Sequence, residues 1–235
     1  MGPYYFGGYF LIKTKPLSYF SFQNKIVQTC SSCINICAFD VEWCLSWTQN
    51  LDNEEKAELG LTDEKIVEIR KWTDQKFNEG TIKWGHALPD LQTVSTFKGS
   101  FYADKDDIRI YSMYLSKMDA ESLIAYFEGE RTFQGLFGLR ENLQKKFEEK
   151  DNPIEEFLGY DFIGVENHGS FHSFYCHNII DELIDKFSLS LNQHGLFHHI
   201  PNPGLIREYL NDKSARVEPV PWYIAKTKRL KIASS

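Results

Sequence analysis

The sequence predicts an α+β fold with a mainly antiparallel sheet and helices packed on one face. Strand-like and helix-like segments come in blocks instead of strict alternation, which is typical of this class. The clearest strand pattern covers residues 36–47, where apolar and polar side chains alternate with a period of two. A chain of 235 residues is long enough for a proper core. We expect one domain, residues 1–235, with a subdivision near 150–159 left open.

The N-terminal part is expected to form strands first and helices afterwards. The expected strands are residues 4–13, 17–23 and 36–47. A helix should begin at Asp52, which forms a capping box with Glu55, and should end at Gly60. A second helix should run from the cap residue Thr62 to Gly80, which stops it.

The middle of the chain mixes irregular and regular segments. Residues 84–100 are expected to be irregular because glycine and proline recur there. Residues 101–102 and 108–115 are expected to form a hairpin around the acidic loop 103–107. Helices are expected at residues 119–127, 139–150 and 154–158.

The C-terminal part contains a histidine window, since six of the seven histidines lie between residues 160 and 199. Two strands joined by a turn are expected at its start, followed by a helix that Asn178 caps. The strands are residues 160–166 and 170–176. A last helix should begin at Asn202 and Pro203, and a final strand should cover residues 217–224.

Charge limits the class of partner. The formal net charge of −7 argues against general nucleic-acid binding, because phosphate contacts need a cationic face. It is compatible with a basic protein partner, for which Asp104, Asp106 and Asp107 are candidate contacts. The basic run over residues 226–231 is interpreted as a solvated edge strand or a frayed terminus.

A cytoplasmic location is expected. The apolar stretch 4–12 is short, and lysines follow it instead of preceding it, which is the reverse of a signal peptide. No stretch approaches the roughly 20 apolar residues of a membrane span. Five cysteines in a long chain do not indicate a disulfide framework. No cofactor is expected.

Four of the five cysteines lie close together: Cys30, Cys33, Cys37 and Cys44. Four thiolates can hold zinc, but the usual pairing of two C-x2-C motifs is missing. In the expected strand 36–47, Cys37 and Cys44 also point to opposite faces. Buried free thiols are therefore favoured over a metal site.

Asp40 and Glu42 form the first enzymatic pattern. They share a face of the expected strand, roughly 7 Å apart, which allows two carboxylates to hold divalent cations. Residues 39–43 locally resemble the first motif of the DEDD-type 3′–5′ exonucleases, which implies metal-dependent phosphoryl chemistry. Two carboxylates on a solvated face of the strand are the simpler interpretation.

The histidine window forms the second enzymatic pattern. Its order of strand, turn, strand, Asn178 and helix resembles the ββα-metal fold of HNH nucleases. That resemblance implies that His168 activates a water molecule and that Asn178 orients it. The window departs from the pattern because Asn167 replaces the acidic residue before His168. In a regular strand, His172 and His177 also face opposite sides, so a structural hairpin is favoured.

The residue pattern in the last third of the chain resembles that of uncharacterised bacterial proteins of the polymorphic-toxin immunity type. The likeness is carried by residues 158–178, 191–197 and 218–222. It implies a non-enzymatic intracellular protein-binding module, an immunity protein that neutralises a toxin, and it carries over no catalytic residues. The alternative is a metal-dependent hydrolase or nuclease that uses Asp40 and Glu42 or the hairpin from His168 to Asn178.

Overall fold

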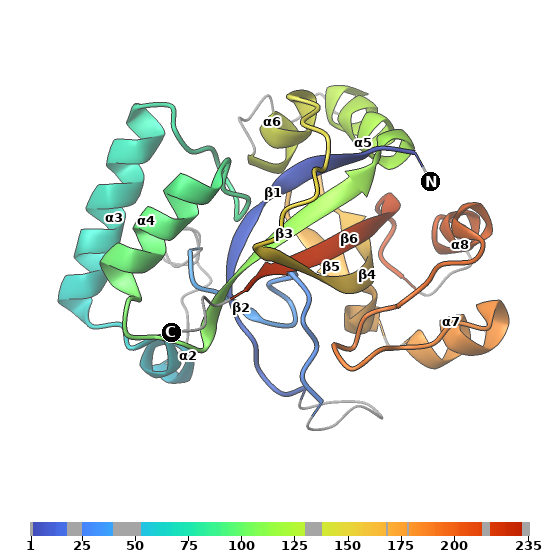
Figure 1. Ribbon diagram of the computed structural model, residues 1–235, viewed down its shortest axis with the longest axis horizontal. Coiled ribbons are helices and arrows are strands. Elements are labelled where there is room, and N and C mark those ends of the chain that lie inside the picture. The colour runs from blue at the N-terminus through green and yellow to red at the C-terminus, as the bar shows by residue number, and fades with distance from the viewer. Residues whose placement is uncertain are drawn as a thin grey trace.

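The computed structural model describes residues 2–17, 25–39, 53–129, 138–167, 169–177, 179–212 and 217–231. Within these ranges, six strands form one antiparallel sheet in the order β2-β1-β3-β6-β4-β5 (Figure 1). The strands are β1 (Tyr4–Lys13), β2 (Ile36–Cys37), β3 (Ile108–Ser116), β4 (Glu155–Val165), β5 (Phe171–Ser173) and β6 (Trp222–Leu230). The fold is α+β, as the sequence predicts.

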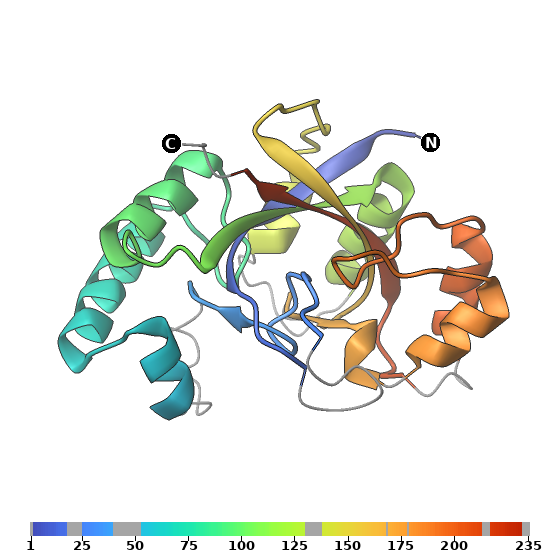
Figure 2. The same cartoon turned by 60° about the horizontal axis from the view of Figure 1, so that its bottom comes forward.

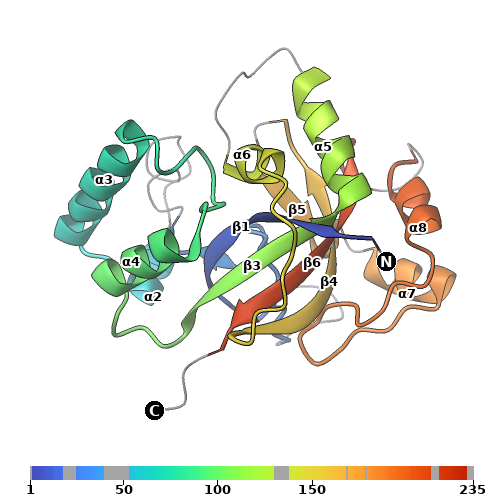
Figure 3. The ribbon, with the colours of Figure 1, turned by 45° about the horizontal axis from the view of Figure 1, so that its top comes forward.

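Seven α-helices and a short 3-10 helix are described with the sheet. They are α2 (Asn53–Leu59), α3 (Asp63–Asn78), α4 (Leu91–Phe101), α5 (Lys117–Gly129), α6 (Gly138–Gln144), η2 (Phe174–His177), α7 (Ile180–Phe187) and α8 (Pro203–Leu210). The three views place α2, α3 and α4 at one end of the sheet and α7 and α8 at the other (Figures 1, 2 and 3). No described helix is long and apolar enough to span a membrane.

The sheet curls into a half-barrel, so that strands far apart in its order approach each other (Figure 2). Phe10 of β1 and Phe171 of β5 are separated by three strands in the sheet order. Their ring centroids are nevertheless 5.7 Å apart, in an edge-to-face contact. Residues 25–35, which precede β2, lie against this curled sheet. One contact that holds them there is the hydrogen bond that Gln28 accepts from Arg229 of β6.

Two glycine bulges bring irregular segments onto the sheet. The pairing register shifts at Gly8 in β1 and at Gly159 in β4, and both residues have a positive φ that favours glycine. A Cβ atom on Gly8 would lie 2.7 Å from the side chain of Ala87, and one on Gly159 would lie 2.6 Å from that of Leu196. These close approaches let backbone bridges form just beyond each bulge.

Two helix starts follow from local capping. The Thr62 hydroxyl accepts a hydrogen bond from the Lys65 amide, which confirms the predicted start of α3. Residues 84–100, however, are not irregular throughout as predicted, because α4 begins at Leu91. The Asp90 carboxylate accepts a 2.7 Å hydrogen bond from the Thr93 amide and starts this helix. Because α4 continues to Phe101, the predicted hairpin partner 101–102 of β3 is also wrong.

Two predicted helices are corrected. The charged helix expected at 139–150 ends at Gln144, and Lys146 just beyond it has a positive φ that does not continue a helix. Residues 154–158 are not a helix, since β4 begins at Glu155 and pairs with β6.

Most of the basic C-terminal run, residues 226–230, lies at the centre of the sheet, in β6 between β3 and β4, and not at an edge as predicted. Its cations are neutralised across the sheet. Lys226 and Lys228 both form ion pairs with Glu149, and Arg229 pairs with Glu156 at 2.8 Å. These long-range partners make a central position possible for a strand that the sequence presents as solvated.

Two other predicted strands have different bounds. The strand expected at 170–176 ends at Ser173, where the chain turns into η2. The strand expected at 36–47 is described only as β2 up to Cys37, and residues 40–52 lie outside the described ranges.

Candidate functional site

Four predicted catalytic residues lie outside the described residues: Asp40, Glu42, His168 and Asn178. The three predicted partner-binding residues, Asp104, Asp106 and Asp107, are described, and all three are exposed. They follow α4 directly and lead into β3.

One carboxylate of the acidic loop forms an ion pair with the sheet. Asp107 forms an ion pair with Lys13 of β1, with 2.5 Å between Oδ2 and Nζ. The hydrogen bond from Lys13 lowers the pKa of the Asp107 carboxyl. The carboxylates of Asp104 and Asp106, in the same loop, are exposed to solvent.

Beside this loop is a hollow of about 400 Å³, formed where α3 begins and α4 ends. Three carboxylates line it: Glu64, Glu68 and Asp104. Phe101 and Ala103 give the hollow an apolar part, and Lys65 is the one cation among the lining residues. The Lys65 ammonium lies 4.9 Å from the centre of the Tyr102 ring and donates to the Gly60 carbonyl. We call the hollow with the exposed loop Asp104–Asp107 the acidic end.

A second group of reactive side chains was not predicted from the sequence. Cys33 of the segment 25–39, His172 of β5 and Cys176 of η2 converge, and their ligand atoms all lie within 4.8 Å of one another. Cys33 Sγ lies 3.1 Å from His172 Nδ1, although the two residues are 139 positions apart. Cys33 is exposed. We call these three residues the Cys–His cluster.

Two carboxylates lie on the other side of the His172 ring. His172 Nε2 is 2.8 Å from Glu218 Oε2 and 3.2 Å from Glu166 Oε1. The imidazole therefore lies between a thiol on one nitrogen and carboxylates on the other. This arrangement fixes the orientation of the ring and favours its protonated form.

The electrostatics of the cluster agree with its geometry. A hydrogen bond from Cys176, followed by contacts with His172, lowers the pKa of Cys33 to about 4. The hydrogen bond with Cys33, its negative charge and the two carboxylates raise the pKa of His172 to about 9. The contact with Cys33 and burial raise the pKa of Cys176. The cluster is thus arranged as a thiolate at Cys33 beside an imidazolium and a thiol.

Buried hydrogen bonds hold Cys33 in this position. The Ser31 hydroxyl donates to the Phe171 carbonyl, and its oxygen accepts from the amides of Cys33 and Ser173. The segment that carries Cys33 is thereby fixed to β5, the strand that carries His172. Ser31 and Ser173 are both fully buried, so these bonds are shielded from water.

Asp161 of β4 closes the same network. Its carboxylate accepts hydrogen bonds from the Thr29 and Ser173 hydroxyls, and it is 1% exposed. Burial raises the pKa of Asp161 to about 7, against the two hydrogen bonds that lower it. Burial therefore favours the protonated form of this carboxyl well above the pH at which an exposed aspartate loses its proton.

Trp222 positions the outer carboxylate. The indole of this β6 residue lies so close to Gly164 of β4 that a Cβ there would be 2.7 Å from the ring. Its Nε1 donates to the Glu218 carbonyl at 3.2 Å, and its ring is 5.4 Å from the His177 ring. The indole therefore fixes the turn that brings Glu218 to His172.

The prediction that His172 and His177 face opposite sides of one strand was wrong. Because β5 ends at Ser173, His177 lies in η2, and its ring centroid is only 6.1 Å from that of His172. The predicted buried thiols are confirmed for Cys30 and Cys37 but wrong for Cys33. The four-residue spacing of His172 and Cys176 was the local signal available, and it indicates a ligand pair only when the segment is helical.

Comparison with known proteins identifies no relative. No protein-family model matches this chain, and no curated protein and no solved structure matches it either.

Proposed function

We propose that the protein is a non-enzymatic protein-binding module that holds a cationic protein partner at its acidic end. Because its last third resembles proteins of the polymorphic-toxin immunity type, the specific form of this proposal is a bacterial immunity protein that neutralises a toxin in the cytoplasm. One observation carries the binding proposal. Three carboxylates surround a hollow with an aromatic part, and further exposed carboxylates adjoin it in the same loop.

The chemistry of the hollow suits a lysine or arginine side chain. Such side chains combine an apolar stem with a charged head, so Phe101 can contact the stem while Glu64, Glu68 or Asp104 pairs with the head. Complementary charge mainly accelerates association and excludes acidic competitors. The binding should therefore weaken as ionic strength rises.

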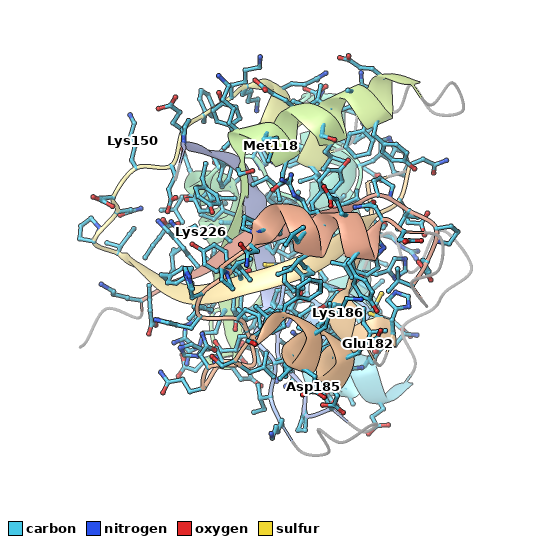
Figure 4. All side chains as sticks on the ribbon, turned by 90° about the vertical axis from the view of Figure 1, so that its right-hand side faces the viewer. Met118, Lys150, Glu182, Asp185, Lys186 and Lys226 are labelled. Carbon is cyan, nitrogen blue, oxygen red and sulfur yellow. The ribbon has the colours of Figure 1, made fainter. Side chains whose placement is uncertain are left out.

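The test is capture of a partner from the organism that encodes the protein. Immobilised protein should retain a basic protein in stoichiometric amount at low salt and release it at high salt. Replacing Asp104 and Asp106 together by Lys should weaken that binding about tenfold or more, because two rim charges change sign. The matched control replaces Asp181 and Asp185 together by Lys. This reverses two exposed charges on α7, the helix on which Figure 4 labels Asp185 and which lies at the opposite end of the sheet from α4 in Figure 1.

The control shows whether a captured protein binds at the acidic end or elsewhere on the molecule. A partner that binds both charge-reversed proteins equally well would contradict the acidic end as the binding surface. Absence of any stoichiometric partner would contradict the proposed function itself. The immunity form has its own test: co-production should protect cells from the product of an adjacent toxin gene, and the Asp104 and Asp106 reversal should remove that protection.

A metal-dependent hydrolase or nuclease is the second candidate function. One observation favours it: Cys33 converges with His172 and Cys176, which both belong to the segment between His168 and Asn178. Purified protein should then cleave DNA, RNA or a simple ester when Zn²⁺ is added. His172→Ala should abolish this cleavage, and activity that survives the substitution, or no activity at all, would contradict the candidate.

A further inference from the structure

We infer that Cys33, His172 and Cys176 bind a zinc ion through their two sulfurs and Nδ1, with a water molecule as the fourth ligand. The inference is independent of the proposed binding function. It rests on the positions of the three ligand atoms, on the carboxylates behind His172 and on the fixed backbone that carries Cys33.

The spacing of the ligand atoms suits a tetrahedral zinc site. Zinc bonds of about 2.3 Å to sulfur and about 2.0 Å to nitrogen place neighbouring ligand atoms about 3.5 Å apart. Cys33 Sγ and His172 Nδ1 are 3.1 Å apart, and all three ligand atoms lie within 4.8 Å. Small rotations of these side chains are enough to accommodate the ion, because Cys33 is exposed and His172 and Cys176 are only partly buried.

The carboxylates complete the pattern expected around a metal-binding histidine. A histidine ligand usually donates its second ring N–H to a carboxylate, which fixes the tautomer and strengthens the metal bond. His172 presents Nδ1 to the sulfurs and Nε2 to Glu218 and Glu166. The ring is therefore already oriented with the correct nitrogen toward the ion.

The ligand set selects the metal. Two thiolates with one imidazole form a soft, nitrogen-containing set that suits zinc, whereas magnesium and calcium require oxygen ligands. Exposure of Cys33 leaves one side of the cluster open to solvent, which is where the water ligand belongs. His177 is not among the residues whose ligand atoms lie within 4.8 Å of one another.

The site would join distant parts of the chain. Cys33 belongs to the segment 25–39, and the other two ligands belong to β5 and η2, 139 or more positions later. Ser31 already fixes the same segment to β5 with buried hydrogen bonds. Zinc would add a second link between the same parts, so that metal binding and folding are coupled.

The experiment uses full-length protein, freed of any histidine tag and kept reduced. Equilibration with zinc followed by gel filtration should leave one zinc per chain by elemental analysis. Cobalt in place of zinc should give a thiolate-to-metal charge-transfer band, which reports the cysteine ligands, and the intense visible d–d bands of a tetrahedral site. Cys33→Ser, Cys176→Ser and His172→Ala should each weaken zinc binding by more than the roughly 10- to 100-fold that loss of an outer carboxylate costs.

The control is His199→Ala, which removes an exposed histidine of the same region and should keep both the stoichiometry and the cobalt spectrum. Circular dichroism identifies variants that fail to fold, and Cys33→Ser is the decisive one because Cys33 is exposed. Glu218→Gln should bind zinc more weakly but keep the charge-transfer band.

Three outcomes would overturn the inference. The first is reduced wild-type protein that retains no zinc after gel filtration. The second is zinc that remains when Cys33, His172 or Cys176 is replaced in folded protein, since the ion would then lie elsewhere. The third is a Cys33–Cys176 disulfide whose reduction restores two free thiols without restoring any capacity for zinc.

Discussion

The acidic end and the Cys–His cluster are built in opposite ways. The acidic end consists of exposed carboxylates from α3 and from one short loop, and its anchored residue, Asp107, uses a single ion pair. The cluster takes its residues from three segments and depends on buried hydrogen bonds around Ser31 and Asp161. Substitutions at the acidic end should therefore change binding with little effect on folding, whereas substitutions near the cluster should change stability.

The largest expected effect is the pH dependence of stability caused by Asp161. Its pKa rises from the ordinary 3.8 to about 7 in the folded protein, so the folded state holds a proton that the unfolded state has lost. The contribution of the Asp161 carboxyl to the free energy of unfolding is fully present below about pH 4 and is lost as the pH rises to about 7. The change is on the order of 4 kcal/mol, at about 1.4 kcal/mol for each pKa unit.

Asp161→Asn isolates this effect because the amide does not titrate. The free energy of unfolding by urea should be measured for both proteins at intervals between pH about 4 and about 8. The variant should gain on the wild type as pH rises. Cys30 and Tyr175, which interact with Asp161, do not titrate in this window, because burial raises the pKa of both. A difference that stays constant with pH would contradict the buried, protonated carboxyl.

The next effect is a contrast between two glycines under the same substitution. Gly164→Ala would place a Cβ 2.7 Å from the Trp222 ring and 2.9 Å from Val220, so it should destabilise the protein by roughly 1–3 kcal/mol. Gly99→Ala in α4 meets no atom within 4 Å and should stabilise that helix by about 1 kcal/mol. Thermal or urea unfolding measures both, and equal effects would contradict the close contact in the sheet.

The smallest expected effect is at the acidic end. Asp107→Asn removes the exposed ion pair with Lys13 and should cost less than about 1 kcal/mol, because solvent screens such pairs. The loss should shrink further in high salt. Urea unfolding at two salt concentrations tests this. A loss of several kcal/mol would mean that the loop is part of the folding core and would remove the contrast between the two regions.

Local signals account for the parts of the fold that could be predicted. Strand β1 has the predicted bounds, and Thr62 caps α3 through its own side chain, as its position before an apolar helical pattern indicated. Helix α4 was missed because glycine and proline near it outweighed one favourable cap, Asp90. Asp104 and Asp106 are exposed, as candidate contacts for a partner must be, because charged side chains in a loop between regular elements favour solvent.

Long-range contacts account for what could not be predicted. Strand β6 is cationic, and only its ion pairs with Glu149 and Glu156 explain its central position. The Cys–His cluster requires Cys33 to meet residues 139 positions away, and no spacing in the sequence encodes that contact. The predicted strand 170–176 also placed His172 and His177 on opposite faces, whereas the chain leaves the strand at η2 and the two rings lie close together.

Hydrogen exchange of the captured complex tests the central claim most directly, because it locates the partner on the chain. We expect backbone amides over residues 62–68 and 100–107 to exchange more slowly in the complex than in the free protein. Residues 169–177, which include β5 and η2, should exchange at the same rate in both. Protection confined to residues 169–177, or no protection at the acidic end, would contradict the proposed binding surface.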